Sequence, residues 1–233
     1  MASLLEQINK KAAQGYRWLK AKAKALGDII SGWVDRYKKY LEEVKRHREY
    51  VAEVLDSKLE YTPEAVDVEL AQRLKQKLGE IEGGKILEHI KTLDLQQRMD
   101  FFEKVLFPLI ANEMGVQTQF LGWFQDNYTA GLYSEELRGI KFNALFLATD
   151  NDYILAVMIN TIIHECKHAM QHDAISGRNT HGYSQELIEQ WRRNFQDYIQ
   201  PVESDEGYAK QPVEWDASGF AESVYPTDKY LGL

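Results

Sequence analysis

Two histidines and a glutamate stand at a spacing that suits a divalent metal ion. Residues 164–168 are His-Glu-Cys-Lys-His, an HExxH pattern. On a helix, residues four apart lie one turn apart on the same face, so His164 and His168 can both reach one ion at about 2.0–2.1 Å. Glu165 is turned by roughly 100° from His164 around the helix. Its carboxylate is therefore expected beside the ion, where it can accept a proton from a zinc-activated water.

A catalytic zinc site normally has three protein ligands, so a third must come from elsewhere in the chain. His172 follows His168 by four residues, but steps of four drift around a straight helix by about 40° each, which favours a core or supporting position for it. Glu214 lies 46 residues after His168, just inside a helix that Pro212 begins. A helix crossing the first one would bring this carboxylate from a new direction. Asp216 is the alternative ligand, or an acceptor for a histidine N–H; without a metal, both acids would be ordinary helix-start residues.

The two segments together resemble known zinc metallopeptidases. HExxH followed by a glutamate on a later helix resembles the gluzincin group. The pattern is most similar to the ImmA/IrrE type of compact metallopeptidase, over about residues 140–226. The residues that carry this resemblance are His164–Ala169, Glu214, Ala217, Phe220, Ala221 and Pro226. Lys167, Ser218 and the longer spacer between the two segments depart from the family pattern.

The resemblance implies a zinc-dependent peptidase with a zincin-like core. It implies His164, His168 and Glu214 as ligands of one zinc ion and Glu165 as the general base that acts on a metal-activated water. The substrate is then a protein or peptide. Hydrolysis needs a second group that stabilises the oxyanion besides zinc. The sequence does not choose among four candidates for this group, His181, Tyr183, Tyr208 and Tyr225.

The elements that must hold these residues are expected to be mostly helices. Capping residues and apolar periodicity are typical of helix starts. The expected helices run from Thr62-Pro63-Glu64 to Gly79, from about Leu95 to Gly115 with an interruption or kink at Pro108, from Tyr153 to about Ile175, from Ser184 to before Pro201, and from Pro212 onward. The HExxH pattern falls inside the helix from Tyr153 to Ile175.

A small sheet is expected before the HExxH helix. Residues 117–124 alternate and are aromatic, and residues 140–147 are a good strand candidate. The strand at 140–147 is the one expected to offer its edge to an extended peptide substrate. The predicted fold class is α+β and mainly helical, with an antiparallel or mixed sheet of about three strands packed against the HExxH helix.

The N-terminal region differs from the remainder in charge and pattern. Residues 1–50 hold twelve Lys and Arg against six Asp and Glu, and the apolar positions from Tyr16 to Val54 alternate at spacings of three and four. This heptad seam predicts a helix packed on its own domain, a self-associating coiled coil, or a segment that contacts a membrane or partner. We therefore divide the chain into a basic heptad-bearing region (1–60), a helical region (61–115) and the zincin-like core (116–233).

The composition limits the classes of partner and the cellular location that are expected for the protein. The net charge is −8, and the acidic main body argues against a general nucleic-acid binder. There is no apolar run of about 18 residues and no classical signal peptide, and the single cysteine fits a reducing compartment. A cytoplasmic location is expected, with delivery to another cell as an alternative. Two other functions stay open, a bacterial effector toxin metalloprotease and a non-catalytic zinc-bearing binding or structural module.

Overall fold

The computed structural model describes residues 39, 42, 45–57 and 61–230. It divides the chain into two units, Met1–Glu53 and Val54–Leu233, and each is described by itself. In the first unit, the described residues 39, 42 and 45–53 are helical. The predicted heptad seam lies for the most part outside the described residues. Its self-association and its contact with a membrane or partner therefore stay predictions.

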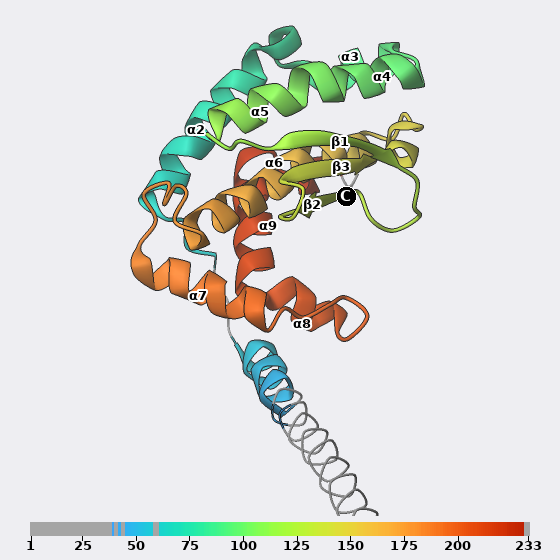
Figure 1. Cartoon of the computed structure of the whole chain (residues 1–233). Coiled ribbons are helices and arrows are strands. Elements are labelled where there is room, and N and C mark those ends of the chain that lie inside the picture. Colours follow the sequence, from blue (N-terminus) through green and yellow to red (C-terminus); the bar gives the residue numbers. More distant parts are fainter. Residues whose placement is uncertain (1–38, 40–41, 43–44, 58–60, 231–233) are drawn as a thin grey trace, which may run out of the picture. The chain divides into compact units, whose positions relative to one another are not determined.

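The second unit consists of helices around a small sheet (Figure 1). The helices are α2 (Ala65–Glu80), α3 (Ile86–Thr92), α4 (Leu95–Phe101), α5 (Phe107–Glu113), α6 (Asp152–Ile175), α7 (Gln185–Gln196), α8 (Asp205–Lys210) and α9 (Pro212–Val224). The strands are β1 (Gln119–Phe124), β2 (Gly131–Ser134) and β3 (Gly139–Asn143). Short helical segments span Ile81–Gly84, Phe102–Leu106, Ala144–Leu147 and Asp228–Tyr230. The predicted mainly helical α+β class is confirmed.

Local capping explains where the helices of the site begin. The side chain of Asn151 accepts from the N–H of Ile154 at the start of α6, and Ser184 accepts from the N–H of Leu187 at the start of α7. Pro212 occupies the first turn of α9, where its missing N–H costs nothing. The predicted starts of these three helices are therefore confirmed.

Pro108 does not break the helical segment from α4 to α5. Residues Phe102–Leu106 adopt a π-helical register, and the N–H of Phe107 donates to the carbonyl of Phe102. A proline ring crowds the carbonyl four residues back, here that of Lys104, and cannot donate to it. The wider π turn accommodates the ring. The expected interruption is thus a change of hydrogen-bond register just before the proline.

The sheet has the strand order β1-β3-β2, with β1 parallel and β2 antiparallel to β3. The predicted strand at 140–147 is wrong beyond Asn143, because residues 144–147 form a 3-10 turn. Asn143 accepts from the N–H of Leu145, and its amide donates to the carbonyls of Asp126 and Thr129. These bonds take the chain out of the sheet. The predicted role of this strand as the exposed edge is also wrong, since β3 is central and β2 is an edge strand.

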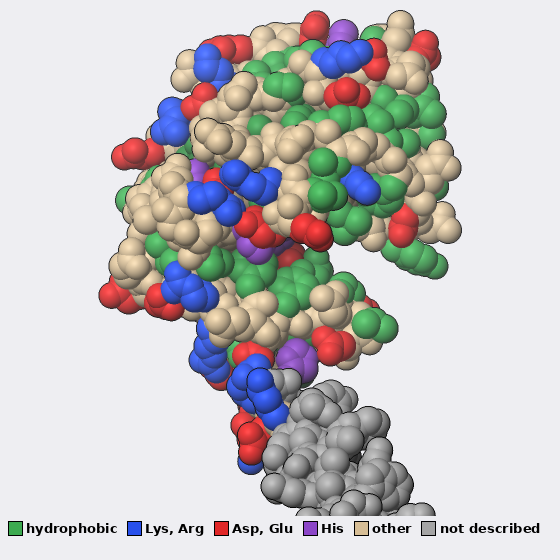
Figure 2. Space-filling model, viewed as in Figure 1, with side chains coloured by type: hydrophobic (Ala, Val, Ile, Leu, Met, Phe, Trp, Pro, Cys, Tyr) green, Lys and Arg blue, Asp and Glu red, His purple; other side chains and the backbone are tan. Residues whose placement is uncertain are grey.

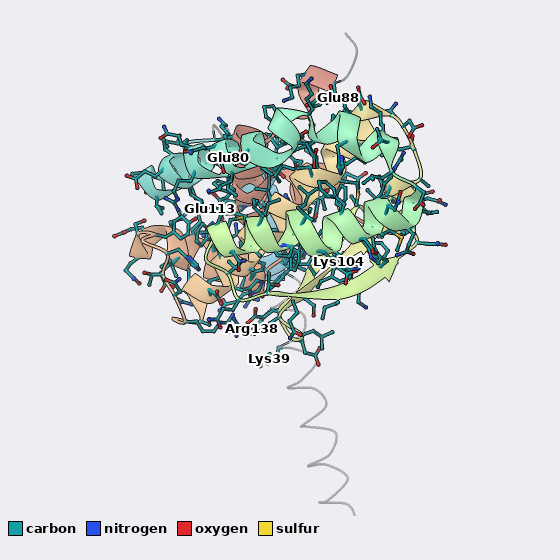
Figure 3. All side chains as sticks on the ribbon, turned by 90° about the horizontal axis from the view of Figure 1, so that it is seen from above. Lys39, Glu80, Glu88, Lys104, Glu113 and Arg138 are labelled. Carbon is teal, nitrogen blue, oxygen red and sulfur yellow. The ribbon has the colours of Figure 1, made fainter. Side chains whose placement is uncertain are left out.

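The helices before the sheet share one hydrophobic core with the elements after it. Figure 3 shows α2, with Glu80, beside the continuous helix that carries Lys104 and Glu113. Phe107 of α5 contacts Phe120 of β1 and Phe142 of β3, at ring-centroid distances of 6.3 and 6.1 Å. β2 packs on α6, and α5 also contacts α6. The division at residues 60 and 115 stays a prediction.

Gly131 is expected to be needed for the contact between β2 and α6. A Cβ atom at this position would lie 2.5 Å from Cγ2 of Thr161 and 3.3 Å from Cγ of Glu165. Gly131→Ala should therefore push β2 away from α6 and lower the free energy of unfolding by about 1–3 kcal/mol. Gly79→Ala is the control, because a Cβ at Gly79 in α2 meets nothing within 4 Å. Equal unfolding midpoints in urea for the two variants would contradict this account of the strand contact.

Candidate metal centre

His164, His168 and Glu214 come together where α6 and α9 cross. The two histidines lie one turn apart on α6, and Glu214 lies in the first turn of α9. Nε2 of His164 is 3.0 Å from Nε2 of His168, and each of these nitrogens is 3.3 Å from a carboxylate oxygen of Glu214. The structure thus brings together the three candidate ligands that the sequence analysis favoured, from stretches 46 residues apart.

The separations suit one tetrahedral ion. Two ligands at about 2.0–2.1 Å from a tetrahedral zinc lie about 3.3–3.4 Å from each other. The two nitrogens are 3.0 Å apart, and the 3.3 Å distances run from His164 to Oε2 and from His168 to Oε1 of Glu214, so all three are close to this value. Two imidazoles and one carboxylate are also a donor set that zinc takes in catalytic sites. In the described part of the chain, the three residues therefore form a candidate metal site.

Gln171 fixes the tautomer of His168. The amide nitrogen of Gln171 donates to the carbonyl of Val213 at 3.0 Å and to Oδ2 of Asp216 at 2.9 Å. Its amide oxygen therefore faces Nδ1 of His168, at 2.9 Å. Nδ1 must carry the proton, so in the neutral ring the lone pair is on Nε2 and points into the site. This is the form in which an imidazole binds a metal.

The charges around Glu214 favour a cation. Burial raises the pKa of Glu214, but His168 and His164 outweigh burial and hold the pKa of this carboxyl well below its usual range. Burial lowers the pKa of His168, but Glu214 and, to a smaller degree, Glu165 and Gln171 outweigh burial and raise it to about 9. The site thus stabilises a positive charge beside an ionised carboxylate, and a divalent ion carries such a charge.

Glu165 lies beside the three candidate ligands and is 7% exposed. Burial raises the pKa of its carboxyl, and the imidazoles of His164 and His168 oppose this effect. The backbone of Tyr133 in β2 hydrogen-bonds to the same carboxyl. The carboxylate therefore lies between the candidate metal site and the edge strand of the sheet.

A cleft of about 490 Å³ opens onto this site. Figure 2 shows the molecule hollowed between the sheet and the part that carries α7 and α8, with histidine side chains in the hollow. The residues lining the cleft include Gly131, Leu132, Tyr133, Glu165, His168, His172, Phe195, Tyr198, Pro201, Tyr208 and Glu214. The cleft is within the range of about 300–1,000 Å³ that is usual for ligand sites.

The other ligand candidates lie outside the triad. The side chain of Asp216 accepts from Gln171, so this acid supports His168 through an amide and is not a ligand. His172 lines the cleft, with its ring 4.1 Å from that of Phe195, and burial lowers its pKa to about 4. Its core or supporting position stays a prediction, and its described contacts are with Glu135, Tyr133 and Phe195.

The unusual Lys167 is fully buried on the side of α6 away from the cleft. Its Nζ lies 2.7 Å from Oδ1 of Asp67 in α2 and 3.4 Å from Oδ2 of Asp216, and it donates to the hydroxyl of Tyr183 at 2.7 Å. The ammonium also lies 4.9 Å from the ring centroid of Phe220. The charge that departs from the family pattern is therefore compensated inside the core, where it joins α2, α6 and α9.

Ser218 is the second departure from the family pattern. Its hydroxyl oxygen lies 3.4 Å from Nδ1 of His164. Ser218 thus stands next to the ring nitrogen of His164 that faces away from the triad.

Of the four residues considered for the oxyanion, Tyr208 is the one that lines the cleft. His181 lies 3.7 Å from Asp173, and the hydroxyl of Tyr183 donates to Asp67 in the core. Tyr225 packs against Tyr230 at a ring-centroid distance of 6.3 Å.

Three residues at the site were missed from the sequence. Tyr198 donates to Oε1 of Glu214 at 2.5 Å, Phe195 lies in the wall of the cleft, and Gln171 orients His168. The position of Gln171, three residues after His168, was a usable signal, since residues three apart on a helix are neighbours. Tyr198 and Phe195 carried no such signal, because α7 meets the site only through the tertiary fold.

Replacing Gln171 is expected to weaken metal binding selectively. Gln171→Leu removes the acceptor that fixes His168, and loss of such a supporting bond typically costs 10- to about 100-fold in metal affinity. Gln211→Leu is the matched control, because Gln211 is also fully buried but bonds to Asn194 and the backbone of Ile199. Titration of each folded variant with zinc measures its zinc affinity. Equal zinc affinities in the two variants would remove the role assigned to Gln171.

No helix in the described ranges combines the length and apolarity that crossing a bilayer requires. The spacing of His164 and His168 and the placement of Glu214 are consistent with the resemblance to zinc metallopeptidases. Comparison of the chain with protein-family models, with curated proteins and with solved structures finds no match.

Proposed function

We propose that this protein is a zinc-dependent peptidase, with His164, His168 and Glu214 as zinc ligands and Glu165 as general base. The observation that carries the proposal is the convergence of the three ligand atoms in a cleft that also holds a buried glutamate. A non-catalytic zinc site would need the triad alone. The placement of Glu165 beside it, with an edge strand above, is what hydrolysis of a peptide requires in addition.

The residues of the chain would divide the work as follows. A zinc ion held by the triad supplies Lewis acidity toward the scissile carbonyl and the attacking water. Glu165 accepts the proton of that water and passes it to the leaving amine. Gln171 keeps His168 in the binding tautomer, and Tyr198 holds the carboxylate of Glu214. We assign the second stabilisation of the oxyanion to Tyr208.

The edge of β2 is the expected place for the peptide backbone. Within the described sheet, β2 pairs with β3 on one side only, so no strand of the sheet pairs with its other edge. An extended peptide can add to such an edge as a further strand. Because Gly131 and Tyr133 of β2 lie against Glu165, a peptide paired there would pass over the candidate metal site.

Metal analysis combined with an unbiased peptide-cleavage profile tests the proposal. We expect about one zinc ion per chain, hydrolysis of peptides by the purified protein, loss of hydrolysis with a chelator and recovery when zinc is returned. Zinc binding without hydrolysis of any peptide would instead favour the non-catalytic zinc-bearing module. Hydrolysis that persists in chelator at full rate would contradict the role of the metal.

A further inference from the structure

Five aromatic rings follow one another along the wall of the cleft. The ring centroids of neighbours are 6.1 Å apart for Tyr208 and Tyr198, 6.2 Å for Tyr198 and Phe195, 4.1 Å for Phe195 and His172, and 5.5 Å for His172 and Tyr133. All five residues line the cleft. We call them the aromatic arc. It extends from the candidate metal ligands to the edge strand β2.

Two of the three tyrosine hydroxyls of the arc are already engaged with protein groups. The hydroxyl of Tyr198 donates to Glu214, and the hydroxyl of Tyr133 donates to Oε2 of Glu135 at 2.8 Å. Phe195, at the middle of the arc, has no polar group. The surface that the arc offers to an incoming group is therefore made mainly of ring carbon atoms.

The lining of the cleft has few partners for a charged side chain, and its uncharged polar members besides the tyrosines and histidines are Thr129 and Gln200. Among the described residues that line it, none is Lys or Arg, and its two acids, Glu165 and Glu214, belong to the proposed catalytic site. Leu132, which is 51% exposed on β2, and Pro201 add apolar surface on opposite sides of the cleft. A charged side chain that lay against the rings of the arc would lose its hydration without a compensating partner there.

We propose that the aromatic arc is a binding subsite for an aromatic or large aliphatic side chain of the peptide substrate, next to the scissile bond. This inference rests on the proposed peptidase function and adds to it the substrate class. A side chain of this kind would cover the apolar rings while the peptide backbone pairs with β2. Burial of one large apolar side chain in such a subsite is worth about 10- to 100-fold in kcat/KM.

A set of matched peptides tests the substrate class. The peptides share one sequence and differ only at one position beside the scissile bond, which holds Phe, Leu, Ala, Asp or Lys. With the zinc-loaded protein we expect kcat/KM for Phe and Leu to exceed that for Ala about tenfold, and that for Asp and Lys by more. Cleavage of the Asp or Lys peptide as fast as the Phe peptide, at every position tested, would overturn the inference.

Two variants test whether the preference for large apolar side chains depends on the aromatic arc and on the rim of the cleft. Phe195→Ala should reduce the ratio of kcat/KM for the Phe peptide over the Ala peptide about tenfold. Leu132→Lys places a cation at the rim of the cleft and should raise the relative kcat/KM for the Asp peptide. Leu137→Lys is the matched control, because Leu137 is 53% exposed but does not line the cleft. If the relative kcat/KM for the Asp peptide is the same in Leu132→Lys and Leu137→Lys, the subsite does not lie in this cleft.

Binding measurements separate failure of this inference from failure of the proposed function. The zinc-loaded Glu165→Gln protein is titrated with the same five peptides, and the dissociation constants are compared. We expect the Phe and Leu peptides to bind about tenfold more tightly than the Asp and Lys peptides. If wild-type protein cleaves no peptide, the peptidase function fails, and the order of binding still decides the inference. Equal binding of all five peptides would overturn the subsite.

Discussion

Glu165→Gln is expected to abolish peptide hydrolysis and to leave zinc bound. The amide keeps the size of the carboxylate and can still accept from the backbone of Tyr133, so the fold and the triad should be preserved. It cannot accept a proton from the attacking water. Loss of a general base typically costs 10²- to about 10⁴-fold in rate. The measurement is kcat/KM on a cleaved peptide together with zinc content.

Glu214→Ala provides the comparison for this result. It removes one of the three proposed ligands, so both zinc and hydrolysis should be lost, whereas Glu165→Gln should lose only hydrolysis. The two variants thus separate the group that moves the proton from a group that holds the ion. A Glu165→Gln protein that hydrolyses peptides at the wild-type rate would sink the proposed mechanism.

Lys167→Met should destabilise the fold strongly. Removal of one member of a buried ion pair leaves an uncompensated charge, which costs about 3–5 kcal/mol. Lys104→Met is a matched control, because Lys104 and Asp100 are also 2.7 Å apart, but their side chains are 63% and 43% exposed. An exposed pair of this kind contributes about 0–1 kcal/mol. Urea unfolding of both variants, with metal removed, measures the difference.

The loss in Lys167→Met should also depend on pH. Burial raises the pKa of Asp216, and Lys167 is the largest effect that opposes this. Without Lys167 the folded-state pKa of Asp216 rises further, so the folded protein binds protons more tightly than the unfolded chain. The variant should therefore regain stability as the pH falls from about 7 toward the ordinary carboxyl range near 4. A loss of stability that does not change over this range would contradict this account.

Much of the site could be predicted because its signals are local. The spacing of His164 and His168 needs only helical geometry, and the starts of α6, α7 and α9 depend on Asn151, Ser184 and Pro212 alone. The third ligand, Glu214, could be chosen because it stands in the first turn of a helix that is separate from α6. These features require no knowledge of which elements pack together.

The remaining features depend on tertiary packing. Asp216 stands two residues from Glu214, and only the crossing of α6 and α9 decides that Glu214 meets the histidines while Asp216 meets Gln171. Residues 144–147 have strand composition, but hydrogen bonds of Asn143 to a distant loop end the strand early. The strand order, which makes β2 an edge strand, likewise cannot be predicted from any single segment of the sequence. A buried Lys167 is not expected from the sequence, because its partner Asp67 lies 100 residues earlier in the chain.

The bond between Lys167 and Asp67 limits how far this molecule could be shortened. A fragment beginning at residue 116 would keep all three proposed ligands and the whole sheet, yet it would lack the carboxylate 2.7 Å from the buried ammonium. It would also uncover the apolar residues of α6 that α5 covers. The smallest autonomous piece that could carry the chemistry therefore has to start before α2, although no side chain of α2 belongs to the triad.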